Sequence, residues 1–520
     1  MPMNAPHIEL DQTQIQDFLQ RVQPLLSPAD FALLNNLVEA ILFLSTLARR
    51  KSDVIVRLLK LIFGATSETS KRVLKKAAQQ DPSPRSPRKG HGRNGAESYP
   101  GAIRNAISHP TLNHGDRCPE CLKGKVYKMS RPGFLLRLLA APLVQAHAFE
   151  LEKLRCNLCG QVFTAPPPPE ATAPKYDPTV GALVPLMKYG TGLPFNRLEK
   201  LQESFGVPLP ASTQWEIVDS AATTIAPVYE ELLRSAAQAQ VLHNDDTSIK
   251  VLSLMKQQQL EDSKRKGMFT TAIVARTEEQ TIACFFTGSN HAGENLEDLL
   301  SRRIAQLPPP IQMCDALSRN LPGTFKTILA NCLTHGRRNF VDTIPAFPEQ
   351  AEYVIDILAR VYHVDDLAKA NRLTADQRLA FHQEHSAPLM QDLKEWLEKQ
   401  LAENSVEPNS SMGKAMLYML NHWPALTLFL RVPNAPLDNN ICERVLKQCI
   451  LHRKNSLFFK SLRGAWVGDL FMSLIATCKL NGANPFAYLT ALLRHAREIL
   501  KAPAEWMPWN YLHTLARLPP

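Results

Sequence analysis

Three acidic residues that are far apart in the sequence have surroundings that suit a metal-binding catalytic site. Asp245 lies in the run HNDDT (243–247), Asp315 follows an apolar stretch, and Glu443 lies shortly after the run LDNN (437–440). Three carboxylates can hold two divalent cations about 4 Å apart, an arrangement that cleaves phosphodiester bonds. Oxygen ligands of this kind favour Mg²⁺. We therefore predict a two-magnesium site formed by Asp245, Asp315 and Glu443.

The stretch around Glu443 combines a helix start with basic residues. Asp438 or Asn439 can cap a helix by accepting its free N–H groups, which places Glu443 near the first turn. A capped surface helix with an acid in its first turn is the alternative interpretation. The basic residues that follow are either contacts to DNA phosphates beside the cut or ordinary solvated side chains: Arg444, Lys447, Arg453 and Lys454.

The order of the predicted strands and helices indicates how the three acids would meet. Runs rich in Val, Ile, Thr and Phe predict strands at 240–252, 267–276, 280–289, 311–317 and 328–333, with a helix at 293–304. Asp245 then lies on the first strand, Asp315 ends the fourth, and Glu443 starts a later helix. This layout is that of ribonuclease H-like nucleases. We therefore predict a multidomain α/β protein with such a core and an all-helical insertion.

Four of the ten cysteines form two Cys-x-x-Cys pairs, Cys118 with Cys121 and Cys156 with Cys159. The N-terminus lacks a basic region followed by an apolar one, so we expect no secretory signal and a reducing, cytoplasmic setting. In that setting two such pairs suit tetrahedral zinc. We predict a structural zinc ion, because a site closed by four thiolates leaves no open position. Unrelated cysteines are the alternative.

The bulk properties point to an anionic partner. The chain has 520 residues and a formal net charge of +10, which favours nucleic acid as the partner. The length predicts three or four domains. No apolar run is long enough to cross a membrane, so we expect no membrane partner.

The remaining segments divide the chain further. We predict a helical N-terminal region at 1–80, either a coiled coil or an intramolecular hairpin, and a basic linker rich in Pro and Gly at 81–110. Arg88, Lys89 and Arg93 of this linker could lie along phosphates or be merely solvated. A zinc module is predicted at 111–170, followed at 171–236 by a helical region that resembles a helix-turn-helix or a plain hairpin. The core is predicted at 237–346 and 436–480, and the helical insertion at 347–435 separates its two parts. A helical tail is predicted at 481–520.

The order of the motifs resembles the transposases of the insertion sequence 66 family, over nearly the full chain. The motifs are LIFGATSE (61–68), HGR (91–93), the two cysteine pairs, DDT (245–247), CLTHGRRNF (332–340), LDNN (437–440) with Glu443, RKNSLF (453–458) and PWN (508–510). The resemblance implies a DDE-type transposase, named for its three catalytic acids, with a ribonuclease H-like core.

The resemblance also implies residue roles. Asp245, Asp315 and Glu443 match the family's three acids, while Asp246 stands where the family usually has Glu. The aromatic residue that often follows the second Asp is replaced by Ala316. In the matching family motif, His335 could position a phosphate or the attacking water, and Arg337 and Arg338 could bind the DNA backbone. A structural histidine is the alternative.

The activity implied is magnesium-dependent cleavage at the ends of a bacterial insertion sequence, followed by strand transfer to target DNA. Expected partners are double-stranded DNA, further copies of the chain that pair two ends, and accessory proteins of the same element. We expect the protein in the cytoplasm, on the nucleoid when bound. The alternatives are a catalytically inactive DNA-binding relic and a ribonuclease H-like nuclease acting on branched or hybrid DNA. The nuclease would not explain the zinc and linker modules.

Overall fold

The computed structural model describes residues 19–27, 30–32, 34–38, 110–127, 143–155, 162–260 and 265–518. The linker residues 81–109 and most of the predicted N-terminal helical region lie outside this set. The chain forms two compact units, one of 1–76, 166–199 and 209–520, and a smaller one of 77–165 and 200–208.

The smaller unit contains a short antiparallel hairpin and a tight turn. Strand β1 (Lys153–Arg155) pairs with β2 (Val162–Thr164). An isolated antiparallel bridge joins Arg117 to Lys125 and encloses the first cysteine pair. Within that turn, Leu122 adopts a left-handed conformation with φ 55°.

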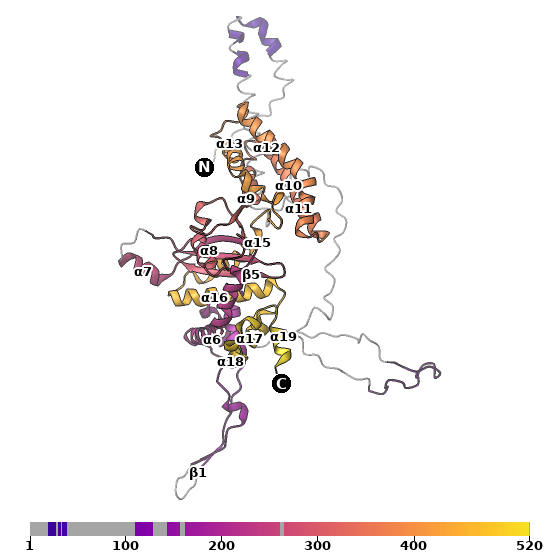
Figure 1. Ribbon diagram of the computed structural model, residues 1–520, viewed down its shortest axis with the longest axis vertical. Coiled ribbons are helices and arrows are strands. Elements are labelled where there is room, and N and C mark those ends of the chain that lie inside the picture. The colour runs from indigo at the N-terminus through magenta and orange to yellow at the C-terminus, as the bar shows by residue number, and fades with distance from the viewer. Residues whose placement is uncertain are drawn as a thin grey trace. The chain divides into compact units, whose positions relative to one another are not determined.

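The larger unit is built on a five-stranded mixed sheet with the strand order β5-β4-β3-β6-β7 (Figure 1). Strand β3 pairs antiparallel with β4 and parallel with β6, so it is the central strand. Strand β4 pairs antiparallel with β5, and β6 pairs parallel with β7. The strand bounds are β3 Val241–Ser248, β4 Phe269–Arg276, β5 Thr281–Gly288, β6 Ile311–Cys314 and β7 Ile328–Asn331. The predicted α/β class and all five strands are confirmed.

Two predicted strands end earlier than expected. Strand β6 stops at Cys314 rather than at Leu317, because the Leu317 N–H donates to the Asp315 carbonyl oxygen at 2.7 Å and turns the chain. Strand β3 stops at Ser248 rather than at Leu252, and helix α7 (Leu252–Leu260) begins at the residue where the strand was expected to end. The predicted helix at 293–304 is α8 (Ala292–Leu300).

Helices cover both faces of the sheet. Register partners on antiparallel strands share a face of the sheet. The side chain of Asp245 is therefore on the same face as that of Ala272, and the side chain of Asp246 is on the same face as that of Thr271. Helix α15 (Asn440–Ser456) packs against β3 and β4, and the Cys442 thiol donates to the Ala272 carbonyl oxygen at 3.3 Å. Helix α8 packs against the same strands, and its Asn295 amide donates to the Thr271 hydroxyl at 2.7 Å. The neighbouring residues Asp245 and Asp246 therefore face different surroundings.

The outer edge of β5 is covered by a polar ladder on helix α16 (Leu462–Leu480), which lies beside it (Figure 1). Side chains one helical turn apart accept the outward N–H groups of alternate β5 residues. The pairs are Thr287 with Asp469 at 2.7 Å, Phe285 with Ser473 at 3.0 Å, Ala283 with Thr477 at 3.0 Å, and Thr281 with Asn481 at 3.2 Å. Buried backbone donors that no strand pairs are satisfied in this way.

Residues between β7 and α15 are helical, as predicted for 347–435. The elements are α9 Leu333–Val341, α10 Pro348–Ala370, α11 Ala375–His385, α12 Ala387–Ala402, α13 Ser411–Asn421, α14 Trp423–Leu426 and η6 Leu428–Leu430. Their apolar faces form one buried cluster that continues to Met313 and Ala330 of the sheet. Within it, the carboxylate of Asp365 lies 2.8 Å from Arg378 Nη2 and 3.2 Å from His382 Nε2.

The segments before and after the sheet are also helical. Before it lie α4 Pro178–Pro185, η4 Leu186–Gly190, α5 Phe195–Ser204 and α6 Ala211–Ala237. After α16 come α17 Pro485–Arg494, α18 Ala496–Lys501, η7 Pro503–Trp506 and α19 Tyr511–Arg517. Helix α6 is 27 residues long and buries Val218, Ile225 and Leu232 completely, so it is a core element. Among the described residues, no helix has the length and apolar character needed to span a membrane.

Candidate active site

The parallel strands bring two of the predicted acids to the same edge of the sheet. The register pairs His243 of β3 with Met313 of β6, and Asp245 and Asp315 each lie two residues further along. The carboxyl ends of parallel strands are where ligands bind in open α/β sheets. Asp315 directly follows β6, so the strand fixes the position of its side chain. Its carbonyl oxygen accepts the hydrogen bond from Leu317 that turns the chain.

Helix α15 brings Glu443 to the face of the sheet that carries Asp245. The helix begins at Asn440, so Glu443 lies in its first turn, as predicted. The preceding residue, Cys442, is completely buried and contacts the register partner of Asp245. Glu443 remains partly exposed, with a side chain 36% accessible to solvent.

His335 joins two of the acids. It lies in the first turn of α9, and its Nδ1 atom is 2.8 Å from Asp315 Oδ1. Its Nε2 atom is 3.9 Å from Glu443 Oε1. Hydrogen bonds to Asp315 and to Cys332 raise the pKa of His335 to about 10, against the opposing effect of burial. The imidazole therefore lies between two carboxylates, which favour its protonated form.

Burial and neighbouring negative charge act strongly on Asp245. Burial, and next the charge of Asp315, raise the pKa of Asp245 to about 7, although the Asp246 N–H donates to its carboxylate at 2.8 Å. A carboxyl group in this position gains from a nearby cation. The oxygen donors of Asp245, Asp315 and Glu443 are of the type that Mg²⁺ prefers, so the donor chemistry suits magnesium.

Asp246, the neighbouring acid, is held on the α8 side. Its side chain is only 2% exposed and pairs with His291 Nδ1 at 3.1 Å and Arg319 Nη2 at 3.4 Å. These contacts connect β3 to the start of α8 and to the loop after Asp315. In this structure the Asp246 carboxylate is therefore occupied by two contacts that hold neighbouring elements together.

The helix start before Glu443 differs from the simple cap that the sequence suggested. Asn439 occupies the N-cap position, but its side chain makes no capping bond. Its amide oxygen lies 3.2 Å from His243 Nδ1, and its amide nitrogen donates to the Asn244 carbonyl oxygen at 3.2 Å. Asp438 accepts the N–H of Asn440 at 3.1 Å. Asn439 thus fixes α15 to β3. The LDNN motif singled out this residue in the sequence but did not indicate the strand that it contacts.

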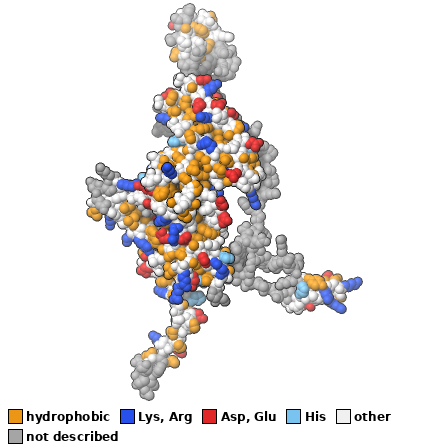
Figure 2. Space-filling model, in the orientation of Figure 1, with side chains coloured by type: hydrophobic (Ala, Val, Ile, Leu, Met, Phe, Trp, Pro, Cys, Tyr) orange, Lys and Arg blue, Asp and Glu red, His pale blue; other side chains and the backbone are white. Residues whose placement is uncertain are grey.

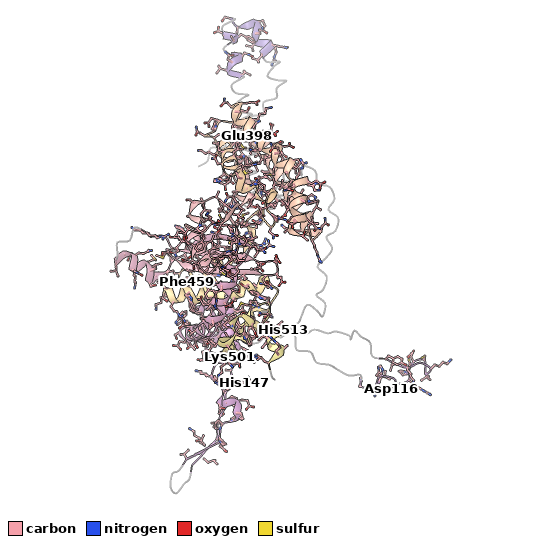
Figure 3. The ribbon with its side chains drawn as sticks, in the orientation of Figure 1. Asp116, His147, Glu398, Phe459, Lys501 and His513 are labelled. Atoms are coloured by element: carbon pink, nitrogen blue, oxygen red, sulfur yellow. The ribbon has the colours of Figure 1, made fainter. Side chains whose placement is uncertain are left out.

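Arg453 is attached to the end of β3. Its Nη1 donates to Thr247 Oγ1 at 2.9 Å and to Ser248 Oγ at 3.0 Å. The chain then turns through Leu457, which has φ 67°, and Phe459 (labelled in Figure 3) donates its N–H to the Lys250 carbonyl oxygen at 2.8 Å. Arg453 therefore positions this turn against the strand that carries Asp245.

The other predicted phosphate contacts differ in exposure. Arg338, Arg444, Lys447 and Lys454 are exposed. Arg337 is only 6% exposed, so its guanidinium lies on the core side of α9. In Figure 2, Lys and Arg side chains are dispersed among acidic ones over the visible face rather than gathered into one patch. Arg88, Lys89 and Arg93 lie outside the described residues.

Half of the predicted zinc site is described. Gly124 donates its N–H to the Cys121 sulfur at 3.4 Å, and Leu122 donates to the Cys118 carbonyl oxygen at 2.9 Å. N–H donation by Gly124 and Lys123 lowers the pKa of Cys121, which favours the thiolate that metals bind. Cys156 and Cys159 lie outside the described residues, so the four-cysteine site stays a prediction.

The sequence of the sheet and its helices matches a known family. The profile of the family described as "Transposase IS66 family" matches residues 175–466, which include both strands that carry the aspartates and the helix that carries Glu443. The chain belongs to the IS66 transposase family. A second profile, "IS66 C-terminal element", matches residues 473–509 of this transposase. The expected family membership is confirmed.

Curated relatives of this IS66 family member come from Sinorhizobium fredii. "Uncharacterized protein y4hP" is 29% identical over 69% of this chain and 67% of its own length. "Uncharacterized protein y4jD" is 27% identical over 64% of this chain and 65% of its own length. The chain thus spans about two thirds of the length of the relatives it matches, and their printed names assign no activity.

Proposed function

We propose that this transposase cuts DNA at the ends of a bacterial insertion sequence and joins the ends to target DNA, with Asp245, Asp315 and Glu443 as its catalytic acids. The observation that carries the proposal is the linkage of these residues at one edge of the sheet. Asp245 lies within β3, two residues past the last residue that pairs with β6, and Asp315 lies at the same level directly after β6. His335 lies between Asp315 and Glu443.

The arrangement of the sheet supports a ribonuclease H-like core. The first three strands form an antiparallel meander, and the fourth pairs parallel with the first. In order of appearance the strands read 3-2-1-4-5 across the sheet, which is the arrangement expected of that fold. The helices between β7 and α15 would then be the insertion that separates the second acid from the third.

Each acid has a distinct part in the proposed chemistry. Asp245 from within β3 and Asp315 from the end of β6 would hold Mg²⁺, and Glu443 would complete the site from α15. Bound magnesium would activate the attacking water or 3′-hydroxyl and stabilise the leaving oxygen. His335 holds Asp315 and Glu443 in position through its two ring nitrogens. Exposed basic residues near Glu443 would contact the DNA backbone, namely Arg444, Lys447 and Lys454.

The remaining expectations form part of the same proposal. A structural zinc ion would be held by Cys118, Cys121, Cys156 and Cys159 and would stabilise the smaller unit. Pairing of two element ends requires at least two copies of the chain on the DNA, and proteins from the same element would assist. The protein would act on chromosomal DNA in the bacterial cytoplasm.

A cleavage assay tests the proposal. The full chain is incubated with Mg²⁺ and labelled DNA that carries an end of its own element, and cleavage is followed by gel electrophoresis. Asp245→Asn, Asp315→Asn and Glu443→Gln should each reduce cleavage by about 10³-fold or more while DNA binding is retained. Asp366→Asn, an exposed acid on α10, is the matched control.

Two outcomes contradict the proposal. Cleavage that survives Asp245→Asn would overturn the assigned mechanism. Specific binding of element ends without cleavage by the wild-type chain would favour the alternative of a catalytically inactive DNA-binding relic.

A further inference from the structure

Three side chains of different chemistry converge beside the proposed magnesium site. One donor atom from each of Asp315, Cys332 and His335 lies within 4.8 Å of the other two. Cys332 has no part in the proposed DNA chemistry. The cluster therefore needs its own explanation.

The strand register brings these residues together. Strand β7 pairs Asn331 with Cys314 of β6, so the next residues, Cys332 and Asp315, leave the two strands side by side. Helix α9 starts immediately after Cys332, which places His335 in its first turn and over the sulfur. The Cys-x-x-His spacing is thus folded around the end of the sheet.

The surroundings of the sulfur favour its role as a ligand. The Asn439 N–H donates to Cys332 Sγ at 3.3 Å, and such bonds stabilise a thiolate and fix its direction. Cys332 is completely buried, whereas the side chains of His335 and Asp315 are 27% and 19% exposed. An ion can therefore reach the cluster from the side of His335 and Asp315.

We propose that Asp315, Cys332 and His335 form a second metal site, selective for a thiophilic divalent cation such as Zn²⁺. A thiolate, an imidazole and a carboxylate match zinc, whereas magnesium prefers oxygen ligands alone. Ligand atoms around tetrahedral zinc lie roughly 3.5 Å apart, so small side-chain movements would bring the three donor atoms to that spacing. Three protein ligands leave the fourth position for water.

This second site competes with the first because both use Asp315. A zinc ion held by Cys332 and His335 would withdraw the Asp315 carboxylate and the His335 ring from the magnesium site. Zinc would therefore inhibit cleavage. The inhibition rests on the proposed function, but the binding of zinc does not.

The binding is tested with Zn²⁺ alone and the full-length protein. Zinc per chain is counted by competition with a chromogenic chelator for the wild type, Cys332→Ser and Cys314→Ser. Cys314 is an equally buried cysteine at the end of β6 that lies outside the cluster, so its substitution is a matched control. We expect Cys332→Ser to bind one zinc ion fewer than the wild type and Cys314→Ser to bind the same number. The four-cysteine site contributes equally to all three and cancels in the difference.

Equal zinc counts in the wild type and Cys332→Ser would overturn the proposal. Thermal melts show whether each variant folds, and His335→Gln provides an independent ligand removal for the same count if Cys332→Ser does not fold. Cobalt substitution adds a second measurement, since loss of Cys332 should remove part of the thiolate-to-cobalt absorption.

The inhibition is tested by adding Zn²⁺ to the magnesium-dependent cleavage reaction. Cys332→Ser should need at least about 10-fold more zinc for half inhibition, whereas Cys314→Ser should behave as the wild type. Inhibition that is equal in all three proteins overturns the competitive role. A zinc count that depends on Cys332 in a chain that never cleaves DNA supports the metal site and contradicts the proposed function, so the two can fail separately.

Discussion

His335 Nδ1 lies 2.8 Å from Asp315 Oδ1, and the opposite ring nitrogen lies 3.9 Å from Glu443 Oε1. One imidazole from α9 therefore spans the acid that follows β6 and the acid that starts α15. These two acids are separated by the whole helical insertion in the sequence. In the proposed site, His335 would hold these two acids near one another.

His335→Gln should slow cleavage by about 10²-fold, because the flexible Gln side chain has no second ring nitrogen and cannot contact both acids at once. DNA affinity should change little. The measurement is single-turnover cleavage of a labelled element end at saturating protein. His385→Gln, on an exposed position of α11, is the control. A rate for His335→Gln within twofold of the wild type would contradict the positioning role.

Substitutions of two neighbouring basic residues should distinguish a structural role from a role in DNA contact. Arg453 is bonded to Thr247 and Ser248, whereas Lys454 is exposed. Arg453→Gln should reduce the cleavage rate at saturating DNA by about 10-fold, because the turn beside β3 loses its anchor. Lys454→Gln should weaken binding and lower the slope of log affinity against log salt by about 1.

The measurement for this pair is fluorescence anisotropy across a salt series, with cleavage rates at saturation. If Arg453→Gln alters the salt slope as much as Lys454→Gln does, the guanidinium contacts phosphate rather than β3.

The ion cluster in the helical insertion should depend on pH. Burial raises the pKa of Asp365, but hydrogen bonding to His382 and the charges of Arg378 and Lys369 outweigh it and hold the pKa well below its usual range. A depressed pKa stabilises the fold fully above the unfolded value of about 4, and this contribution is lost progressively as the pH falls from there through the lower folded value. Asp365→Asn should cost about 3 kcal/mol at pH 7.

Thermal unfolding at pH 7 and at about pH 3 tests the cluster. The difference in Tm between wild type and Asp365→Asn should narrow at the lower pH. Asp366→Asn changes the same residue type at the next, exposed position of α10 and should leave Tm unchanged at both pH values. A constant difference for Asp365→Asn would exclude its ionisation as the cause.

Two buried threonines give a matched test of the α16 ladder. Thr477 Oγ1 accepts the Ala283 N–H at 3.0 Å, whereas the buried Thr490 Oγ1 on α17 has no hydrogen-bond partner. Thr477→Val should cost about 1–3 kcal/mol, since it leaves a buried donor unsatisfied. Thr490→Val should be neutral or stabilising. Chemical denaturation of both variants checks this, and equal effects would show that the ladder bond adds nothing.

The sequence predicts the strands well because the core residues of β4 and β5 form continuous apolar runs that are buried on both faces. Their ends were less predictable. Ala316 and Leu317 continue the apolar pattern of β6, but the backbone turns at Asp315 to form a local hydrogen bond. The local amino-acid composition does not show that this hydrogen bond is formed in place of further strand pairing.

The candidate acids were predictable from motif and strand order, whereas their supporting partners were not. Asp438 or Asn439 was expected to cap the helix, and Asp438 does accept the Asn440 N–H, but the Asn439 side chain bonds to His243 and Asn244 across the fold. Cys332 was visible only as part of a motif. Its proximity to Asp315 follows from the parallel register of β6 and β7, which pairs residues by tertiary packing rather than by local sequence.

The side chains that α16 places along β5 also restrict how the protein can assemble. An exposed edge strand is an open template onto which a strand of another chain can be added. Here the outward donors of β5 are already occupied by Asp469, Ser473, Thr477 and Asn481. A second copy therefore cannot extend the sheet at this edge. Copies brought together on DNA, as proposed, would have to meet through surfaces other than this edge.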